Sequence, residues 1–234
     1  MKATEPVVRY VLDEFTRLAN AQKAVEMAAY MKTTMPFYGI QKPDRIPVYK
    51  EIARLFRPQS RKEYERNVKA LWSQTHREVK YAALGYAGKF SEFVSFESMP
   101  LFEQLVREGA WWDLVDDIAI NLIGDVLLKD RSTVTPLIKQ YVRDDDMWIR
   151  RTSLICHNHH KKQTDQKLLL ATCVKLAAER EFFIRKAIGW ALREYSSANP
   201  AAVMKFLDDN KTILSPLSFR EGAKYLIRKG YIQS

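Results

Sequence analysis

The segment Trp111-Trp112-Asp113-Leu114-Val115-Asp116-Asp117-Ile118 begins an apolar-periodic stretch that predicts a helix near residues 111–129. Asp116 falls beside Trp112 at i,i+4 and among apolar residues, away from the polar side of the helix. A carboxylate in such surroundings loses hydration, so we expect Asp116 to be paired or to have a chemical task. The same helical wheel, at about 100° per residue, predicts one apolar stripe that faces the core: Leu114, Val115, Ile118, Leu122 and Val126.

The wheel also places Asp125 within an apolar arc, so expected burial alone does not distinguish Asp116 from it. Helical periodicity dominates the rest of the chain, and no convincing strand with a period of two residues is present. Connections are short, and no linker rich in Ser, Gly or Pro divides the chain, so we predict a single all-α domain over residues 1–234. The other expected helices lie near residues 5–19, 21–33, 43–56, 61–73, 76–88, 97–108, 133–143, 146–159, 164–179, 181–196, 199–209 and 216–229.

Local patterns indicate where some helices begin. Thr75 with Glu78 has the spacing of a capping box, and the acidic run at 144–146 supplies a cap for the helix that follows. The loop at 35–43, Met-Pro-Phe-Tyr-Gly-Ile-Gln-Lys-Pro, excludes helix through its Pro and Gly residues. Its aromatic side chains either pack or are exposed for contact with a ligand.

Short triplets recur near the starts of several expected helices. Their apolar first members are separated by 36, 34 and 35 residues. A period of this size in pairs of helices is typical of HEAT-like repeats. We therefore predict an α-solenoid with a concave basic face, built on these triplets: Val79-Lys80-Tyr81, Val115-Asp116-Asp117, Ile149-Arg150-Arg151 and Ile184-Arg185-Lys186.

If the triplets stack, they place basic side chains in one stripe: Lys80, Arg150, Arg151, Arg185 and Lys186. Such a stripe fits contact with a nucleic-acid backbone, and an ordinary solvated basic face explains it equally well. Asp116 interrupts the stripe and repels the phosphates that its neighbours attract. We therefore expect Asp116 to meet a positive charge on the ligand.

The composition favours a polyanionic partner, because the net charge is +10 at pH 7 and the pI is about 9.5. A basic protein without such a partner has the same composition. No apolar run approaches the roughly 18 residues of a membrane span, and the first residues lack the apolar segment of a secretion signal. Cys156 and Cys173 are too few for a disulfide framework, so we expect a reduced cytoplasmic protein.

Three histidines, His157, His159 and His160, raise the question of a metal site. No third ligand joins His157 and His160, and histidines at a helix end more often serve the helix dipole or bind phosphate. No Gly-rich phosphate loop, nucleophile elbow or catalytic carboxylate pair is present, so an enzyme here has one carboxylate to work with. Indoles that either fill the core or stack on sugars and bases recur near the same part of each repeat: Trp112, Trp148 and Trp190.

The chain resembles the AlkD-type alkylpurine DNA glycosylases nearly end to end, and its WWDxVD and FFIxKAIGWxLREY patterns are specific. The resemblance implies an all-α fold of HEAT-like repeats. It also implies excision of positively charged N3- and N7-alkylated purines without base flipping, with bulky adducts accepted by some members. The matching segments are Tyr30-Met31-Lys32, Phe37-Tyr38-Gly39-Ile40-Gln41, Trp111-Trp112-Asp113 with Val115-Asp116, Trp148-Ile149-Arg150-Arg151, and 182–190 with 192–195.

The resemblance further implies roles for individual residues. Asp116 matches the catalytic aspartate, and Trp112 and Trp190 match the tryptophans that frame it against the deoxyribose of the lesion. Arg151 matches the arginine that sits by that site and contacts the DNA backbone. The other expected DNA contacts are Tyr30 and Gln41, matched by motif, and Lys80, Arg150, Arg185 and Lys186 of the basic stripe.

The residues and the resemblance agree on one mechanism. A cationic alkylpurine leaves as a neutral base, so no strong general acid is needed, and Asp116 would stabilise the oxocarbenium-like sugar. We expect a monomer that acts on alkylated purines in double-stranded DNA, needs no cofactor or metal, contacts no membrane, and works in the cytoplasm at the nucleoid. The alternatives are a non-catalytic HEAT-like module that binds DNA or structured RNA, and a helical scaffold for acidic protein partners.

Overall fold

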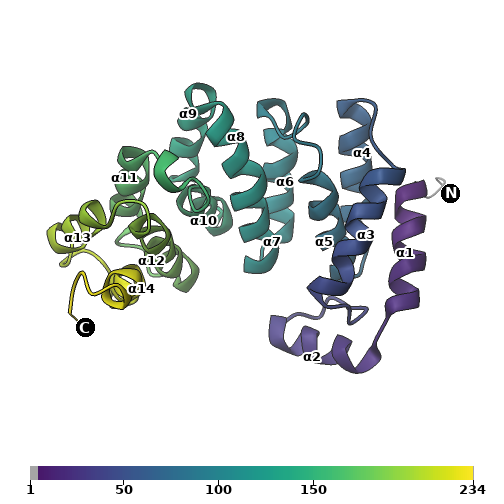
Figure 1. Ribbon diagram of the computed structural model, residues 1–234, viewed down its shortest axis with the longest axis horizontal. Helices are drawn as coiled ribbons and strands as arrows, with labels where there is room; N and C mark the ends of the chain where they lie inside the picture. The colour runs from purple at the N-terminus through teal and green to yellow at the C-terminus, as the bar shows by residue number, and fades with distance from the viewer. Residues whose placement is uncertain (1–4, 234) are drawn as a thin grey trace. The chain divides into compact units, whose positions relative to one another are not determined.

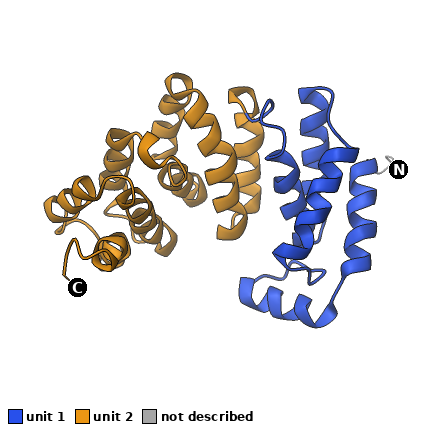
Figure 2. Ribbon diagram, viewed as in Figure 1, with its two compact units in different colours: residues 1–94 blue, residues 95–234 orange. Residues whose placement is uncertain are grey.

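The computed structural model describes residues 5–233, and every regular element in that range is helical, which confirms the predicted all-α class. The contacts divide the chain into two compact units, residues 1–94 and 95–234 (Figure 2). The single domain over residues 1–234 stays a prediction, because each unit is described by itself. Among the described helices, none combines the length and the apolar character that a membrane span requires.

Unit 1 contains a buried apolar core to which the first helix contributes Val7, Val11 and Phe15. The expected helix ranges agree closely with the observed ones. Helix boundaries follow local chemistry, as at Asn20, whose side chain caps its helix by accepting a hydrogen bond from the Lys23 N–H. The helices of this unit are α1 (Pro6–Leu18), α2 (Ala21–Met31), α3 (Lys42–Leu55), α4 (Arg61–Trp72) and α5 (Arg77–Ala87) (Figure 1).

Glu78 of α5 does not form the predicted capping box with Thr75, and that prediction is wrong. Its buried carboxylate instead accepts hydrogen bonds from the backbone N–H groups of Tyr38, Gly39 and Ile40, at 3.0, 2.8 and 3.1 Å. These donors belong to the aromatic loop, so one carboxylate fixes the path of that loop. Sequence spacing could not reveal the contact, because the loop lies far from Glu78 along the chain.

The aromatic loop is packed rather than presented to a ligand. Phe37 is only 8% exposed. Tyr38 stacks on His76, with 4.1 Å between the ring centroids. Of the two alternatives left open for these aromatic side chains, packing is therefore the one that the structure supports.

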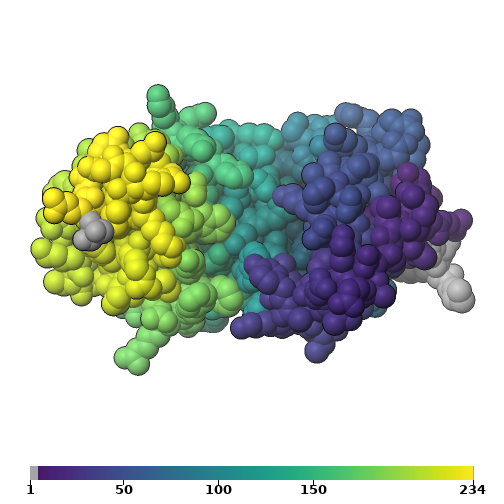
Figure 3. Space-filling model, turned by 60° about the horizontal axis from the view of Figure 1, so that its bottom comes forward, coloured from purple at the N-terminus to yellow at the C-terminus, as the bar shows by residue number. Residues whose placement is uncertain are grey.

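Unit 2 contains the remaining helices and ends in α14, near the C-terminus, which is yellow in Figure 3. Two of its helices, α12 and α14, pack closely, and Gly189 makes this possible, because a Cβ there would lie 2.4 Å from the Glu221 Cβ. Apart from the central helix, the elements of this unit are η1 (Phe96–Ser98), α6 (Met99–Gly109), α9 (Arg131–Tyr141), α10 (Met147–Ile155), η3 (Lys161–Gln163), α11 (Gln166–Leu176), α12 (Phe182–Ser196), α13 (Pro200–Asp209) and α14 (Pro216–Arg228).

The central helix predicted at 111–129 is continuous but changes type in its middle. It comprises α7 (Trp112–Asp117), the π-helical segment η2 (Ile118–Ile123) and α8 (Gly124–Lys129). Asp125 is exposed, contrary to the wheel, because the wider turns of η2 change the phase of every residue that follows. The predicted core stripe is confirmed, since none of its members is more than 1% exposed: Leu114, Val115, Ile118, Leu122 and Val126.

The repeat is visible in the packing. Val79, Val115, Ile149 and Ile184 are each 0% exposed and lie near the starts of α5, α7, α10 and α12. Within unit 2, α10 packs against both α7 and α12. Equivalent positions in successive helix pairs thus carry equivalent buried residues, as the predicted helical-repeat fold requires.

Candidate functional site

An open cavity of about 340 Å³ lies in unit 2, where α7, α10 and α12 meet. The structure brings together in it four residues that the sequence singles out, Trp112, Asp116, Arg151 and Trp190. Lys186 of the predicted basic stripe also borders it. The complete lining is aromatic and charged: Trp112, Asp116, Arg151, Phe182, Phe183, Lys186, Trp190 and Arg193.

The Asp116 carboxylate in this cavity is paired with the Arg151 guanidinium. Arg151 Nε donates to Asp116 Oδ1 and Arg151 Nη2 donates to Asp116 Oδ2, each at 2.8 Å. Arg151 Nη1 donates to the Phe183 carbonyl oxygen at 2.6 Å. The side chain of Arg151 is 4% exposed and that of Asp116 is 14% exposed, so the carboxylate is the more accessible member of the pair.

The charge state of Asp116 follows from these contacts. Burial raises the pKa of the Asp116 carboxyl group above its ordinary value, and the hydrogen bonds and charge of Arg151 oppose that rise. Because a bidentate guanidinium is among the strongest partners of a carboxylate, Arg151 favours the ionised form of Asp116. A poorly hydrated anion interacts strongly with any positive group that enters the cavity.

The chain itself supplies a positive charge beside Asp116, and the expected contact of Asp116 with a positive charge on the ligand stays a prediction. Asp116 and Arg151 come from successive repeats, so the acid of one repeat meets the base of the next. Each carboxylate oxygen keeps a further lone pair beyond the one that faces Arg151. The pair therefore orients the carboxylate without saturating it.

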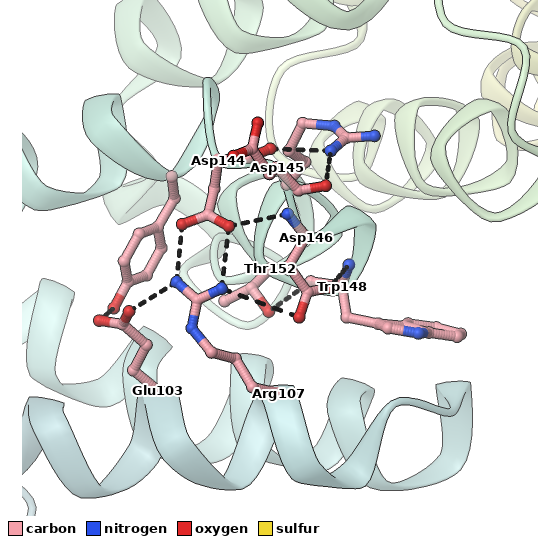
Figure 4. Close-up of polar contacts among 9 residues, drawn as sticks. Glu103, Arg107, Asp144, Asp145, Asp146, Trp148 and Thr152 are labelled. Atoms are coloured by element: carbon pink, nitrogen blue, oxygen red, sulfur yellow. Dashed lines mark hydrogen bonds and ion pairs between the residues drawn. The ribbon is translucent and has the colours of Figure 1, made fainter.

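The start of α10 is anchored by the acidic run that precedes it. As predicted, Asp146 caps the helix, and its side chain accepts a hydrogen bond of 2.8 Å from the Trp148 N–H. Arg107 of α6 donates to both carboxylate oxygens of Asp144, at 2.9 and 2.7 Å (Figure 4). These contacts fix the first turn of α10, and thereby the position of Arg151 on it.

Arg150, which was expected to contact the DNA backbone, belongs to the same anchoring network. Its Nε and Nη2 donate to the Glu179 carboxylate at 2.6 and 3.0 Å. Its Nη1 donates to the carbonyl oxygens of Asp144 and Asp145, at 2.8 and 2.9 Å. A phosphate contact by Arg150 stays a prediction, and these bonds weigh against it because the side chain is only 13% exposed.

The tryptophans that recur along the sequence have different surroundings. Trp148 is 8% exposed and packs on Phe183, with 4.9 Å between ring centroids, so it belongs to the core. Trp112 and Trp190 are only partly buried and border the cavity. Trp190 is oriented by a hydrogen bond of 3.0 Å from its Nε1 to Glu194 Oε1. Two indoles thus share the cavity with the carboxylate of Asp116.

Positive side chains surround one side of the cavity and converge on Glu221 of α14. Lys186 Nζ lies 2.9 Å from Glu221 Oε1, and Arg193 Nη1 donates to Glu221 Oε2 at 3.1 Å. Burial acts to raise the pKa of Glu221, yet hydrogen bonds from Lys224 and Lys186 hold it below its usual value. A neighbouring cavity of about 460 Å³ shares Arg193 and adds further basic side chains: Lys161, Lys224 and Arg228.

Sequence reasoning did not single out Phe182 and Arg193 as lining residues, or Glu221 as their support. The sequence did contain an indication for Phe182, because Phe182, Lys186 and Trp190 follow at i, i+4 and i+8 and share one face of α12. Phe182 is 55% exposed at the cavity. Glu221 gave no such signal, since it reaches the site from a different helix.

Four other predicted DNA contacts lie outside this cavity. Tyr30 and Gln41, both in unit 1, border a common cavity of about 530 Å³. Lys80, also in unit 1, donates to the Trp72 carbonyl oxygen, and its Nζ lies 4.8 Å from the centroid of the Trp72 ring. Arg185 of α12 is partly buried. The DNA contacts of these residues stay predictions.

Two of the three histidines that follow α10 are buried. His157 is 2% exposed and His160 is 4% exposed, while His159 is exposed. His160 Nε2 lies 2.8 Å from the Gly124 carbonyl oxygen. Burial lowers the pKa of His157 to about 3, so the ring is neutral and adds no charge to the helix end. Within residues 5–233, no group of His, Cys, Asp and Glu side chains is arranged to hold a metal ion.

Comparisons with known proteins agree with this fold. A family model described as "DNA alkylation repair enzyme" matches residues 11–226. The chain is also similar to a solved structure described as a predicted DNA alkylation repair enzyme from Enterococcus faecalis. The TM-score is 0.81, the sequence identity is 32%, and the match covers 89% of this chain and 96% of that chain. No curated protein matches the chain.

Proposed function

The chain belongs to the family of DNA alkylation repair enzymes, and from this membership and the geometry of the cavity we propose that it is a DNA glycosylase. It hydrolyses the N-glycosidic bond of positively charged N3- and N7-alkylated purines, such as 3-methyladenine and 7-methylguanine, in duplex DNA. One observation carries the proposal: a poorly hydrated carboxylate, Asp116, held by a guanidinium, shares an open cavity with two indoles and a basic rim.

The cavity residues have different roles toward the sugar and toward the phosphates. Asp116 faces the deoxyribose of the lesion and stabilises the positive charge that develops on the sugar ring. It also orients the water that attacks the anomeric carbon. Trp112 and Trp190 contact the sugar with their ring faces, which favour a positive charge. Arg193 and Lys186 bind the phosphates that flank the lesion.

The magnitudes fit a labile substrate. A carboxylate about 4 Å from a unit charge contributes about 4 kcal/mol at an effective dielectric constant of 20, and the opposite charge of Arg151, about twice as far away, removes about half of it. About 2 kcal/mol remains, which is roughly a thirtyfold rate increase. Contact with the two indole faces adds about 1 kcal/mol each in a desolvated site. A rate increase of this size is enough for a cationic alkylpurine, because it already leaves as a neutral base.

The cavity favours catalysis without base flipping. Enzymes that extrude a base read its edge through hydrogen bonds in a snug pocket. The polar groups that line this open cavity are charged side chains suited to a sugar cation and to phosphates, and Arg151 is already bonded to Asp116 and Phe183. The base therefore stays in the duplex while the sugar and backbone contact the protein.

A second function, a non-catalytic DNA-binding module, is favoured by the Asp116–Arg151 pair itself. An acid whose charge is balanced within the chain no longer repels phosphates, so the pair could serve the fold alone. Incubating the protein with methylated duplex DNA and measuring the released bases separates the two functions. Release of 7-methylguanine that depends on Asp116 supports the glycosylase, and tight duplex binding without release supports the module.

A further inference from the structure

We propose that the groove between α9 and α11 binds an acidic amphipathic helix of a partner protein. The groove has a volume of about 730 Å³, about twice that of the Asp116 cavity, and the two have no lining residue in common. Its lining residues belong to α9, α11 and the ends of the segments that adjoin them, whereas the Asp116 cavity is built on α7, α10 and α12. The DNA repair chemistry proposed above makes no use of it.

The floor of the groove is apolar and open. Val142 is partly buried, Leu168 is 5% exposed, and Ala171 is exposed. An apolar floor of this kind gains free energy when another apolar surface covers it, at about 25 cal/mol per Å². Phosphates gain nothing from such contact, so the floor favours a protein segment over a nucleic-acid backbone.

The rim of the groove is basic and lacks ion pairs. Lys139 lies on α9 and Arg143 in the turn after it, and Lys167 and Lys175 lie on α11. In the part of the chain that the structure describes, none of these side chains forms an ion pair, although basic residues around the Asp116 cavity are paired with acids. The acid beside them, Asp165, is used to cap α11 through a hydrogen bond of 2.9 Å from the Leu168 N–H. The charges of the rim are therefore available to carboxylates of a partner.

The spacing of the lining residues fits a helix as the occupant. Thr135 and Lys139 are one turn apart on α9, with Arg143 in the turn that follows the helix, and Leu168 and Lys175 are seven residues apart on α11. The α11 wall is therefore about 10 Å long, or about two helical turns. A third helix with apolar residues at i, i+3 or i+4, and i+7 fills such a groove, and Glu or Asp residues beside that stripe meet the basic rim.

Binding of a designed peptide to the full chain tests the proposal. The probe is a fluorescent peptide of about 14 residues with a Leu stripe at helical spacing and Glu at most other positions. A scrambled peptide of the same composition lacks the stripe. We expect the first peptide to bind at least about tenfold more tightly than the second, as measured by fluorescence anisotropy.

Variants of the groove make the test specific. Lys139→Glu with Lys175→Glu reverses the rim charge, and Ala171→Glu places an acid at an exposed floor position. Each should weaken binding of the Leu/Glu peptide at least about tenfold. The matched control, Lys62→Glu with Lys69→Glu on α4, changes the net charge equally at exposed positions outside every cavity described above, and should leave binding within about twofold.

Three results would overturn the proposal. The first is equal binding of the Leu/Glu peptide and its scrambled form, or equal weakening by the groove and control variants. The second is a groove variant that weakens binding of undamaged duplex DNA as strongly as binding of the peptide, which would make the groove a DNA surface. The third is self-association of the free chain in sedimentation that the groove variants abolish, which would make a second copy the occupant.

Discussion

The Asp116 carboxylate and the Arg151 guanidinium lie side by side, joined by two hydrogen bonds of 2.8 Å across neighbouring helices. This pair is the structural unit of the candidate site. Arg151 sets the orientation of the carboxylate and favours its ionised form, and the anchoring of α10 by Arg107 and Asp144 fixes Arg151 in turn. Whatever Asp116 does chemically, it does as a member of a pair.

The first prediction concerns that pair. Asp116→Asn should lower release of 7-methylguanine at least about thirtyfold, because the sugar cation loses its opposite charge. It should also lower the free energy of unfolding by about 2 kcal/mol, since Arg151 stays buried without a charged partner. Base release from methylated duplex and unfolding in urea measure the two effects. Asp117→Asn on the same helix is the control and should change neither; normal release by the Asp116 variant would refute the catalytic role.

The sequence was most informative where function and helical periodicity coincide. Asp116 stands out on the helical wheel because it lies beside Trp112 among apolar residues, where an acidic side chain does not contribute to a hydrophobic core. The apolar stripe of the central helix is buried as predicted. The wheel failed at Asp125, since the π-helical segment before it changes the phase. The partner of Asp116 could not be predicted either, because the contact with Arg151 depends on the packing of successive repeats.

The second prediction distinguishes basic residues that contact DNA from basic residues that do not. Arg193 borders both cavities of the site, so Arg193→Gln should reduce the slope of log binding constant against log salt concentration by about 0.9, as expected for one lost phosphate contact. Arg143→Gln removes the same charge from the α9–α11 groove and should leave the slope unchanged. Titration of undamaged duplex at several salt concentrations measures both slopes. An equal decrease in the two variants would show that overall charge, rather than position, determines duplex binding.

The third prediction concerns the packing of α12 on α14. A Cβ at Gly189 would lie 2.4 Å from the Glu221 Cβ and 2.8 Å from the Ser218 carbonyl oxygen, so Gly189→Ala forces the helices apart. We expect a loss of about 2 kcal/mol in the free energy of unfolding. Gly222→Ala is the matched control, since its nearest contact would be 3.3 Å from a Leu192 side chain. Urea unfolding should show little change for Gly222→Ala, and equal losses in both variants would contradict the close-packing argument.

The fourth prediction is a pH dependence caused by His157. Its folded-state pKa of about 3 lies below the ordinary value of 6.5, so the unfolded chain binds a proton that the folded chain does not. The contribution of this group to the free energy of unfolding is fully present above pH 6.5 and is lost progressively as the pH falls toward 3. The loss is about 2 kcal/mol at pH 5. His157→Phe should therefore flatten the stability profile between pH 7 and pH 5. His159→Phe, at an exposed position, should leave the profile of the parent protein unchanged, and an unaltered slope in the His157 variant would contradict the buried neutral ring.

The fifth prediction concerns the charge of the substrate, on which the proposed chemistry depends most directly. A single carboxylate and two indoles help a base that is already a good leaving group, but they cannot protonate a neutral purine as it departs. We therefore expect release of 3-methyladenine and 7-methylguanine from duplex DNA, with little release of hypoxanthine or uracil. Matched duplexes that differ only in the lesion allow the rates to be compared, and Asp116→Asn controls for spontaneous loss of the alkylated bases. Comparable rates for hypoxanthine and 7-methylguanine would show that the protein supplies a general acid. Electrostatic stabilisation by Asp116 would then be insufficient as the mechanism.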